Sequence, residues 1–121
     1  MSGGAVEKSL IPEDPEDLKL ITLARAAQAR SQGPQGACLR DTDGRAYAAA
    51  SVHLEHLRLS AVAVAVATAV SSGASGLEAV AFVGEQAPNT KDLEILRDIA
   101  VDGAVVWWAD CAGTVQSMIE L

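Results

Sequence analysis

His56–Gly73 reads HLRLSAVAVAVATAVSSG, and this stretch decides how the rest of the chain must be arranged. From residue 59 to residue 70, only Ser60 and Thr68 carry a polar side-chain atom. The alternation of Ala and Val could indicate a strand, because Val is β-branched. The length of the segment and its alanine content favour a helix instead. A helix that is apolar on all sides is a buried one, so we expect the rest of the protein to wrap it.

The composition describes one acidic domain with an aliphatic core. The chain has 121 residues, a length that suits a single domain, and 50% of them are apolar. Aromatic residues make up only 3%, so the core should be aliphatic. Sixteen acidic residues outnumber nine Lys and Arg, which gives a net charge of −7. A nucleic-acid binder normally carries a basic patch. We therefore expect neither nucleic acid nor a membrane surface as a partner.

The termini and cysteines indicate a cytoplasmic protein. The longest apolar run is shorter than the about 20 residues that span a bilayer. The N-terminal sequence MSGGAVEKSLIPED lacks the apolar segment of a secretory signal. Cys38 and Cys111 lie far apart in the sequence and should be free thiols in a reducing compartment. Residues 1–15 should form a flexible tail before a domain at residues 16–121.

The remaining pattern predicts an alternation of helices and strands. Asp14-Pro15 suits the start of a helix over about 16–32, which Gly33 would end. Residues 41–44 (DTDG) are typical of a hairpin turn between two antiparallel strands. The two strands around this turn are expected at about 35–41 and 45–53, and the central helix follows them. Next come a buried strand at 77–83 and a helix that Pro88-Asn89 opens, with Gly103 at its C′ position. A strand at 104–109 and a last strand or short helix at 114–121 complete the predicted order.

Strands that alternate with helices late in the chain imply crossovers and a largely parallel part of the sheet. We therefore expect an α/β fold, a three-layer α-β-α sandwich with a mixed sheet of about five strands. Helices should cover both faces of this sheet.

Several short motifs follow one another along this order of elements. Residues 18–30 (LKLITLARAAQAR) precede Gly36-Ala37, and Asp43-Gly44-Arg45 follows. Ser60-Ala61-Val62 opens the central helix, and residues 88–92 (PNTKD) open the next one. In this order and spacing the chain resembles the cytidine deaminase family, whose first helix, first hairpin, C-A-E helix and P-C-x-x-C helix these motifs match in turn. The likeness covers about residues 16–121 and implies the same fold.

The resemblance implies a zinc site in which thiolates, or two thiolates and a His, hold the metal, while a Glu that is no ligand moves the proton. Ser60 stands at the position of the first ligand and Val62 at that of the Glu. Asn89 and Asp92 stand at the positions of the two Cys. One Ser, one Asn and one Asp do not make a zinc site, and Val transfers no proton. Sliding the alignment by two residues places Val at both the first-ligand and the Glu positions, so the loss does not depend on the register.

The positions that hold the sugar in the family differ as well. Ser51 and His53 stand where the second strand of the family ends with Asn and Glu, and the first strand lacks the usual Phe. These departures predict a pseudoenzyme with no catalytic residue, no metal and no cofactor. It would keep a vestigial pocket at Ser51, His53, Ser60, Val62, Pro88, Asn89 and Asp92.

Purely structural roles suit several of these residues. Asn89 with Asp92 reads as an ordinary helix start, and Ser60 could cap the central helix. His53 and His56 are expected to be partly exposed loop residues, because two His alone define no metal site.

The aromatic pair and the two cysteines have structural interpretations too. Trp107 and Trp108 should face opposite sides of a strand, with one in the core and the other outward or at an oligomer contact. Cys38 reads as a core residue. Cys111 lies in a turn beside Asp110, whose charge disfavours a thiolate.

Three functions stay open at this point. The first is a non-catalytic protein that acts by protein association, as a homo-oligomer (a dimer or tetramer, which the resemblance implies) or with another protein. The second is a module that binds a nucleoside or another small polar molecule in the vestigial pocket. The third is a cytidine deaminase-type hydrolase that uses unrecognised residues.

Overall fold

The structure is a computed structural model, and it describes residues 11–121. The elements in chain order are α1 (Pro15–Ser31), β1 (Gly36–Asp41), β2 (Ala46–Ala50), β3 (Val52–His53), β4 (Arg58–Leu59), α2 (Ala61–Ser71), β5 (Leu77–Val83), α3 (Thr90–Arg97), β6 (Ala100–Ala109) and β7 (Val115–Glu120). Five strands form a sheet in the order β2-β1-β5-β6-β7. β5 and β6 run parallel, joined by the crossover helix α3, and the other neighbours in this sheet are antiparallel. The predicted mixed sheet is confirmed, although its parallel part is a single pair of strands.

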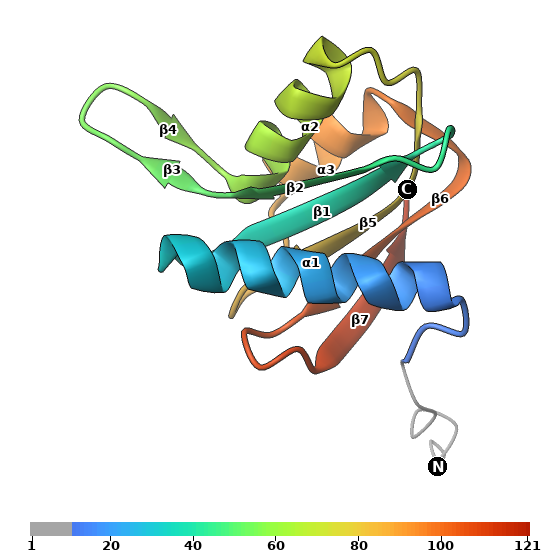
Figure 1. Cartoon of the computed structure of the whole chain (residues 1–121), viewed down its shortest axis with the longest axis horizontal. Coiled ribbons are helices and arrows are strands. Elements are labelled where there is room, and N and C mark those ends of the chain that lie inside the picture. The colour runs from blue at the N-terminus through green and yellow to red at the C-terminus, as the bar shows by residue number, and fades with distance from the viewer. Residues whose placement is uncertain (1–10) are drawn as a thin grey trace.

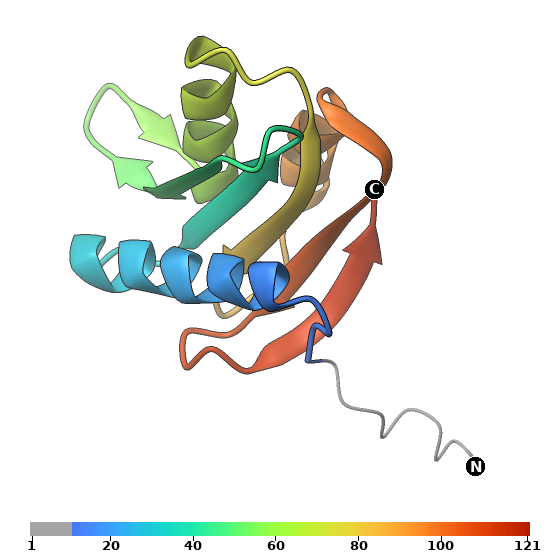
Figure 2. The same cartoon turned by 45° about the vertical axis from the view of Figure 1, so that its right-hand side comes forward.

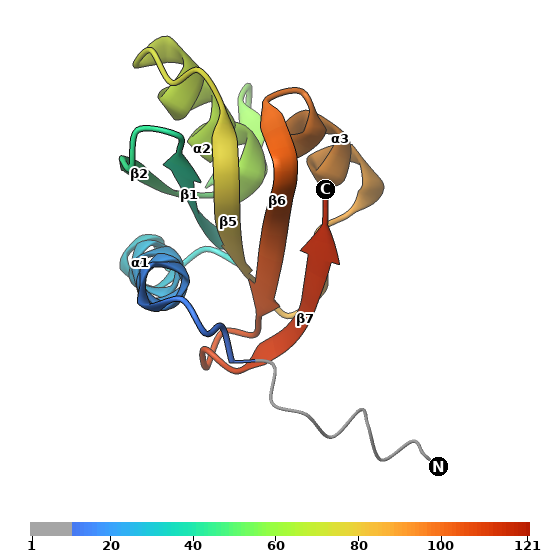
Figure 3. The same ribbon diagram turned by 90° about the vertical axis from the view of Figure 1, so that its right-hand side faces the viewer.

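Helices cover both faces of the sheet, which confirms the three-layer sandwich (Figures 1 and 3). α1 lies across β1 and β5 on one face, and α2 and α3 lie on the other. The core is aliphatic, as expected, and Phe82 is the aromatic residue among its fully buried side chains. Among residues 11–121, no helix is long and apolar enough to cross a membrane.

α1 begins and is anchored through acidic side chains. Asp14 caps the helix, since its Oδ1 accepts a hydrogen bond of 2.8 Å from Glu16 N. Asp17 is buried one turn further on, where it pairs with Arg40 Nη1 at 2.9 Å and accepts a hydrogen bond of 3.0 Å from Trp107 Nε1. The helix ends at Ser31 and not at residue 32, because Gln32 takes the left-handed conformation with φ 58°.

The predicted tail at residues 1–15 falls mainly on residues 1–10, outside the described part of the chain. Pro15 already belongs to α1, and Pro12 is buried against the body of the protein. The other residues from 11 to 15 are exposed, and the division into a tail and a domain stays a prediction.

A buried carboxylate organises the predicted hairpin turn. Asp41 Oδ1 accepts hydrogen bonds of 2.9 Å from Asp43 N and from Arg45 N, and Oδ2 accepts one of 3.2 Å from the Tyr47 hydroxyl. Burial alone would raise the pKa of Asp41, but these hydrogen bonds lower it below its usual value. Gly44 completes the turn with φ 85°.

The second strand, predicted at 45–53, ends earlier than expected. β2 stops at Ala50, which pairs with Gly36, the first residue of β1. One more backbone hydrogen bond follows, from Ser51 N to Gln35 O at 3.3 Å, and the chain then leaves the sheet. Residues 52–59 form a separate two-stranded ribbon, in which β3 pairs with β4.

The third helix is shorter than predicted. α3 ends at Arg97, and the chain enters β6 at Ala100, where Leu77 N already donates to Ile99 O at 2.8 Å. Gly103 is not a helix cap. It lies inside β6 with φ 85°, where the pairing with β5 is irregular. Pairing with a neighbouring strand has overridden the local helix signal.

α2 is less buried than its composition predicts. Ala61, Val62, Ala65, Val66 and Ala69 face the core, whereas Ala67 and Thr68 are exposed and Val70 keeps 49% of its surface exposed. Within the described part of a single chain nothing covers this outer side, because the sheet lies on the other side of the helix. The expectation that the chain wraps the helix completely is wrong for one copy of the protein.

Candidate functional site

The N-termini of α2 and α3 meet on one face of the sheet. Ser60 caps α2, with its Oγ accepting a hydrogen bond of 3.1 Å from Ala63 N. Asn89 caps α3, with its Oδ1 accepting one of 2.8 Å from Asp92 N. The Ser60 hydroxyl also donates to Asp92 Oδ1 at 2.7 Å. The predicted capping roles are confirmed, and Ser60, Asn89 and Asp92 form one cluster.

Solvent reaches this cluster at Asn89, while Ser60 is half-buried. Asp92 and Pro88 are buried, Val62 is fully buried in the core, and Asn89 is exposed. Within residues 11–121, Asp92 Oδ2 has no hydrogen-bond partner. The Asp92 carboxylate lies in the first turn of α3 and beside the cap of α2, where a negative charge is favourable because helix N-termini carry partial positive charge.

A groove of about 280 Å³ adjoins the cap of α2. Among the predicted pocket residues, Ser51, His53 and Ser60 line it, while Val62, Pro88, Asn89 and Asp92 do not. The other lining residues are Pro34, Gln35, Val52, Arg58 and Leu59.

Gln35 is a site residue that sequence reasoning missed. Its Oε1 accepts a hydrogen bond of 3.1 Å from Ala61 N, the first N–H group of α2. Together with Ser60 it satisfies N–H groups of the first turn of α2. The sequence carries no signal for this contact, because residues 35 and 61 belong to elements far apart in the chain.

The residues in this cluster do not fit the zinc ion that the cytidine deaminase resemblance implies. Two oxygen ligands of a tetrahedral zinc, each about 2.0 Å from the metal, lie roughly 3.3 Å apart. Ser60 Oγ and Asp92 Oδ1 are 2.7 Å apart and are bonded directly to each other. Asn89 Oδ1 is engaged by a backbone N–H group. Among residues 11–121, no group of three or more His, Cys, Asp or Glu side chains could hold a metal ion.

A profile of the family described as "Cytidine deaminase-like" matches residues 13–113. The chain belongs to the cytidine deaminase-like family. A comparison with curated proteins finds no match.

Solved structures of cytidine deaminases share the fold. The enzyme from Burkholderia pseudomallei superposes with a TM-score of 0.74 at 23% identity, over 84% of this chain and 90% of that chain. The enzyme from Mycobacterium leprae gives 0.66 at 22% identity, over 81% and 89%. The enzyme from Mycobacterium tuberculosis gives 0.64 at 23% identity, over 73% and 80%. At these identities the likeness is one of fold.

The two Trp residues face opposite sides of β6, as predicted. Trp107 packs with the α1 side of the core, and Trp108 packs with the α2 side. Both are half-buried, and each indole N–H is paired, Trp107 with Asp17 and Trp108 with the Gly84 carbonyl oxygen at 2.9 Å. Each lies on a face that helices cover and keeps part of its surface exposed, so an oligomer contact at one of them stays a prediction.

The histidines and cysteines lie outside the Ser60–Asp92 cluster. His53 and His56 are exposed on the ribbon, in line with their predicted loop character. Cys38 and Cys111 are free thiols, as expected. Burial raises the pKa of the Cys38 thiol to about 11. Burial, followed by the nearby carboxylate of Glu85, also raises the pKa of Cys111.

The β3–β4 ribbon projects from the edge of the sheet as an arm (Figures 1 and 2). We use the name arm for residues 52–59. Three of its apolar side chains, Leu54, Leu57 and Leu59, are exposed. β4 of the arm packs against α2. Three solvent-exposed leucines on one projecting ribbon are typical of a surface that another protein covers.

Proposed function

We propose that this protein is a non-catalytic member of the cytidine deaminase-like family that carries no zinc and acts by association, as a dimer or tetramer of its own chain. The direct hydrogen bond from Ser60 to Asp92 is the observation that carries the non-catalytic part. The exposed leucines of the arm carry the association part.

The side chains at the ligand positions argue against metal-assisted hydrolysis. Ser60 Oγ and Asp92 Oδ1 are bonded to each other at 2.7 Å, and one hydroxyl, one amide and one carboxylate are a poor ligand set for zinc. Val62 occupies the position of the proton-transferring Glu and is packed in the core, where a carboxylate would need a partner.

Two apolar surfaces support self-association. The arm exposes Leu54 at 59% and Leu57 at 48%, and the outer side of α2 exposes Val70. The arm and α2 are neighbours, because Ser60 alone separates β4 from the helix. A second copy that covers the arm and the outer side of α2 would remove apolar area from water, and this removal is the main driving force of association.

The catalytic part is tested on the purified full chain by metal analysis and by cytidine turnover. We expect no bound zinc and no formation of uridine. Stoichiometric zinc, or turnover that a chelator abolishes, would overturn this part of the proposal and favour the cytidine deaminase-type hydrolase.

The association part is tested by measuring molar mass in solution over a concentration series. We expect a dimer or tetramer, and we expect the double substitution Leu54→Ser and Leu57→Ser to shift it toward the monomer. Leu23→Ser is the matched control, since Leu23 is 41% exposed but lies on α1, away from the arm. A wild-type chain that stays monomeric throughout would contradict self-association.

A second candidate is a binding module for a nucleoside or another small polar molecule. The groove beside Ser51, His53 and Ser60 favours it, because it offers two hydroxyls and an imidazole within about 280 Å³. A ligand that binds only the folded chain must raise its melting temperature. A nucleoside panel that leaves the melting temperature unchanged would remove this candidate.

A further inference from the structure

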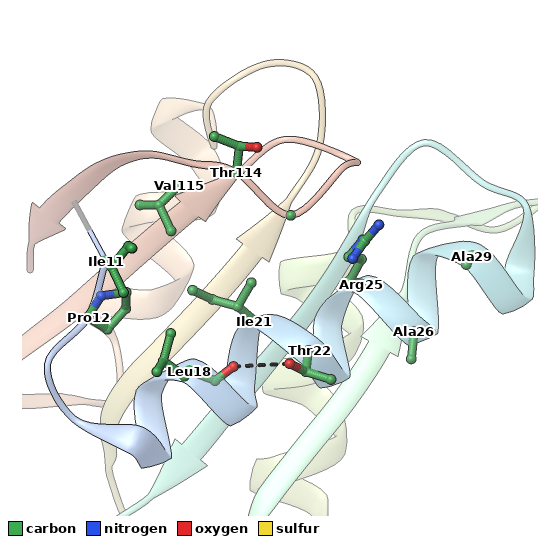
Figure 4. Close-up of a pocket in the computed structure, with 11 residues that line it drawn as sticks. Ile11, Pro12, Leu18, Ile21, Thr22, Arg25, Ala26, Ala29, Thr114 and Val115 are labelled. Carbon is green, nitrogen blue, oxygen red and sulfur yellow. Dashed lines mark hydrogen bonds between the residues drawn. The ribbon is translucent and has the colours of Figure 1, made fainter. Parts of the chain in front are cut away.

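A second and larger groove lies on the other face of the sheet, between α1 and the start of β7 (Figure 4). Its volume is about 840 Å³, within the range of small-molecule sites. The residues that line it are Ile11, Pro12, Leu18, Ile21, Thr22, Arg25, Ala26, Ala29, Gly113, Thr114 and Val115. Its lining is mostly apolar, and it belongs to neither the Ser60–Asp92 cluster nor the arm.

The apolar part of the groove leaves large side chains open to water. Ile11 and Leu18 are exposed, and Ile21 and Val115 extend the same lining toward the sheet (Figure 4). An apolar ligand body would cover this surface and gain free energy in proportion to the area removed from water.

The polar groups of the lining are mostly engaged within the protein. The Thr22 hydroxyl donates to Leu18 O at 3.3 Å. Thr114 N donates to Asp110 Oδ1 at 2.9 Å, and Thr114 O accepts from Asp110 N and from Gln116 Nε2. A peptide laid in this groove would bury backbone groups with few partners, which is unfavourable. The lining therefore suits a ligand whose body has no hydrogen-bonding groups.

Arg25 is the charged residue among those that line the groove. Its Nε donates to Cys111 O at 3.3 Å, and its side chain packs against Gly113, which holds the guanidinium beside the groove. Among residues 11–121, no carboxylate lies within 4.0 Å of its guanidinium nitrogens, the distance of an ion pair. Its terminal nitrogens are therefore available for an anion from outside.

We propose that this groove binds a free apolar monocarboxylate, with the carboxylate on Arg25 and the hydrocarbon body over Ile21 and Val115. A guanidinium and a carboxylate make a strong charge-assisted pair. A single cation on a chain of net charge −7 selects one negative charge and disfavours polyanions. The inference is independent of the proposed function, since it uses the opposite face of the sheet.

The test titrates decanoate, below its micelle concentration, into the full chain and follows binding by calorimetry. Decan-1-ol, which has the same hydrocarbon body without the charge, is titrated in parallel. We expect decanoate to bind more tightly than decanol. Arg25→Gln should weaken decanoate binding about tenfold or more and leave decanol unchanged, because only the charged head loses its partner.

Three further variants test whether decanoate binds in this groove. Arg30→Gln, on the last turn of the same helix but outside the groove, should leave both titrations unchanged. Arg25→Lys should restore part of the decanoate affinity. Leu18→Ser should weaken both probes, and the melting temperature of each variant checks that it is folded. Absence of decanoate binding to the wild type, or equal binding to wild type, Arg25→Gln and Leu18→Ser, would overturn the proposal.

Discussion

Replacing Gly36 with Ala should push α1 away from the sheet, because this glycine lies directly beneath the helix backbone. A Cβ atom at Gly36 would stand 2.1 Å from Ala24 O and 2.9 Å from Gln28 N. A carbon atom seldom comes closer to a carbonyl oxygen than roughly 3.3 Å. Ala24 O and Gln28 N are both backbone atoms of α1, so no side-chain rotation relieves the contact. The helix must therefore move by about 1 Å.

A movement of this size disturbs the packing that holds α1 to the sheet. Leu20 and Ala24 are buried against the strands, and Asp17 is bonded to Arg40 and Trp107. Overpacking of a well-packed core costs about 1–3 kcal/mol and occasionally more. Because a whole helix must shift, we expect a loss of about 3 kcal/mol, a large part of the roughly 5–15 kcal/mol that stabilises a domain. The melting temperature should fall by about 10 °C.

Urea unfolding followed by tryptophan fluorescence measures this loss, since Trp107 is bonded to α1 through Asp17. The matched control is Gly33→Ala. A Cβ atom at Gly33 would meet the hydroxyls of Ser51 and Ser31 at 3.2 and 3.3 Å, and hydroxyls can rotate away. We expect the control to stay within about 0.5 kcal/mol of the wild type. A loss below about 1 kcal/mol for Gly36→Ala, or equal losses for both variants, would refute the close approach of α1 and β1.

Three other predictions test the turn, the thiols and the helix N-termini. The pKa of Asp41 is lower in the folded chain than in the unfolded one, so the ionised carboxylate stabilises the fold at neutral pH, and this stabilisation is lost as the pH falls below about 4. Asp41→Asn should therefore make the free energy of unfolding depend less steeply on pH in the acid range. In a thiol titration with a disulfide reagent at pH 8, Cys111 should react slowly in the folded protein, because its pKa is raised. Cys38 should react only after unfolding, because burial raises the pKa of Cys38 to about 11. Equal reaction rates of the two thiols in the folded protein would contradict the packing. Ser60→Ala should cost about 2 kcal/mol in urea unfolding, because it removes a helix cap and leaves Asp92 Oδ1 unpaired. Asp92→Asn, which keeps an acceptor for the Ser60 hydroxyl, should reduce the free energy of unfolding by less than Ser60→Ala does. A chelator should not change the urea midpoint of the wild type.

Local signals predicted the parts of the fold that neighbouring residues determine. Asp14, Ser60 and Asn89 each cap the helix that follows, and the DTDG turn joins two antiparallel strands. The errors arise where a distant segment decides. β2 ends at Ala50 because β1 begins at the residue that pairs with it, and the run before Gly103 becomes strand because β5 is beside it. Neither partner can be identified from the local pattern.

The candidate site also contains residues that the sequence predicted and residues that it did not. The family resemblance placed Ser60, Asn89 and Asp92 at related positions, and the structure brings these three together through two hydrogen bonds. It could not predict Gln35 at the first turn of α2, because that contact depends on how β1 and α2 are oriented. The groove beside Arg25 was not predicted either, since its walls come from the two ends of the chain.

The meeting of α2 and α3 explains how the fold can persist without the metal that the family resemblance implies. Two helix N-termini brought together place partial positive charge and free N–H groups in one spot, which is unfavourable unless negative charge or acceptors neutralise them. The cytidine deaminase resemblance implies thiolates and a metal for this role. Here the Asp92 carboxylate lies at that spot, the Ser60 hydroxyl joins it to α2, and the amides of Asn89 and Gln35 accept N–H groups of the two helices. The hydrogen bond that stabilises this junction engages Ser60 Oγ and Asp92 Oδ1, so a zinc ion at these two atoms would have to displace it.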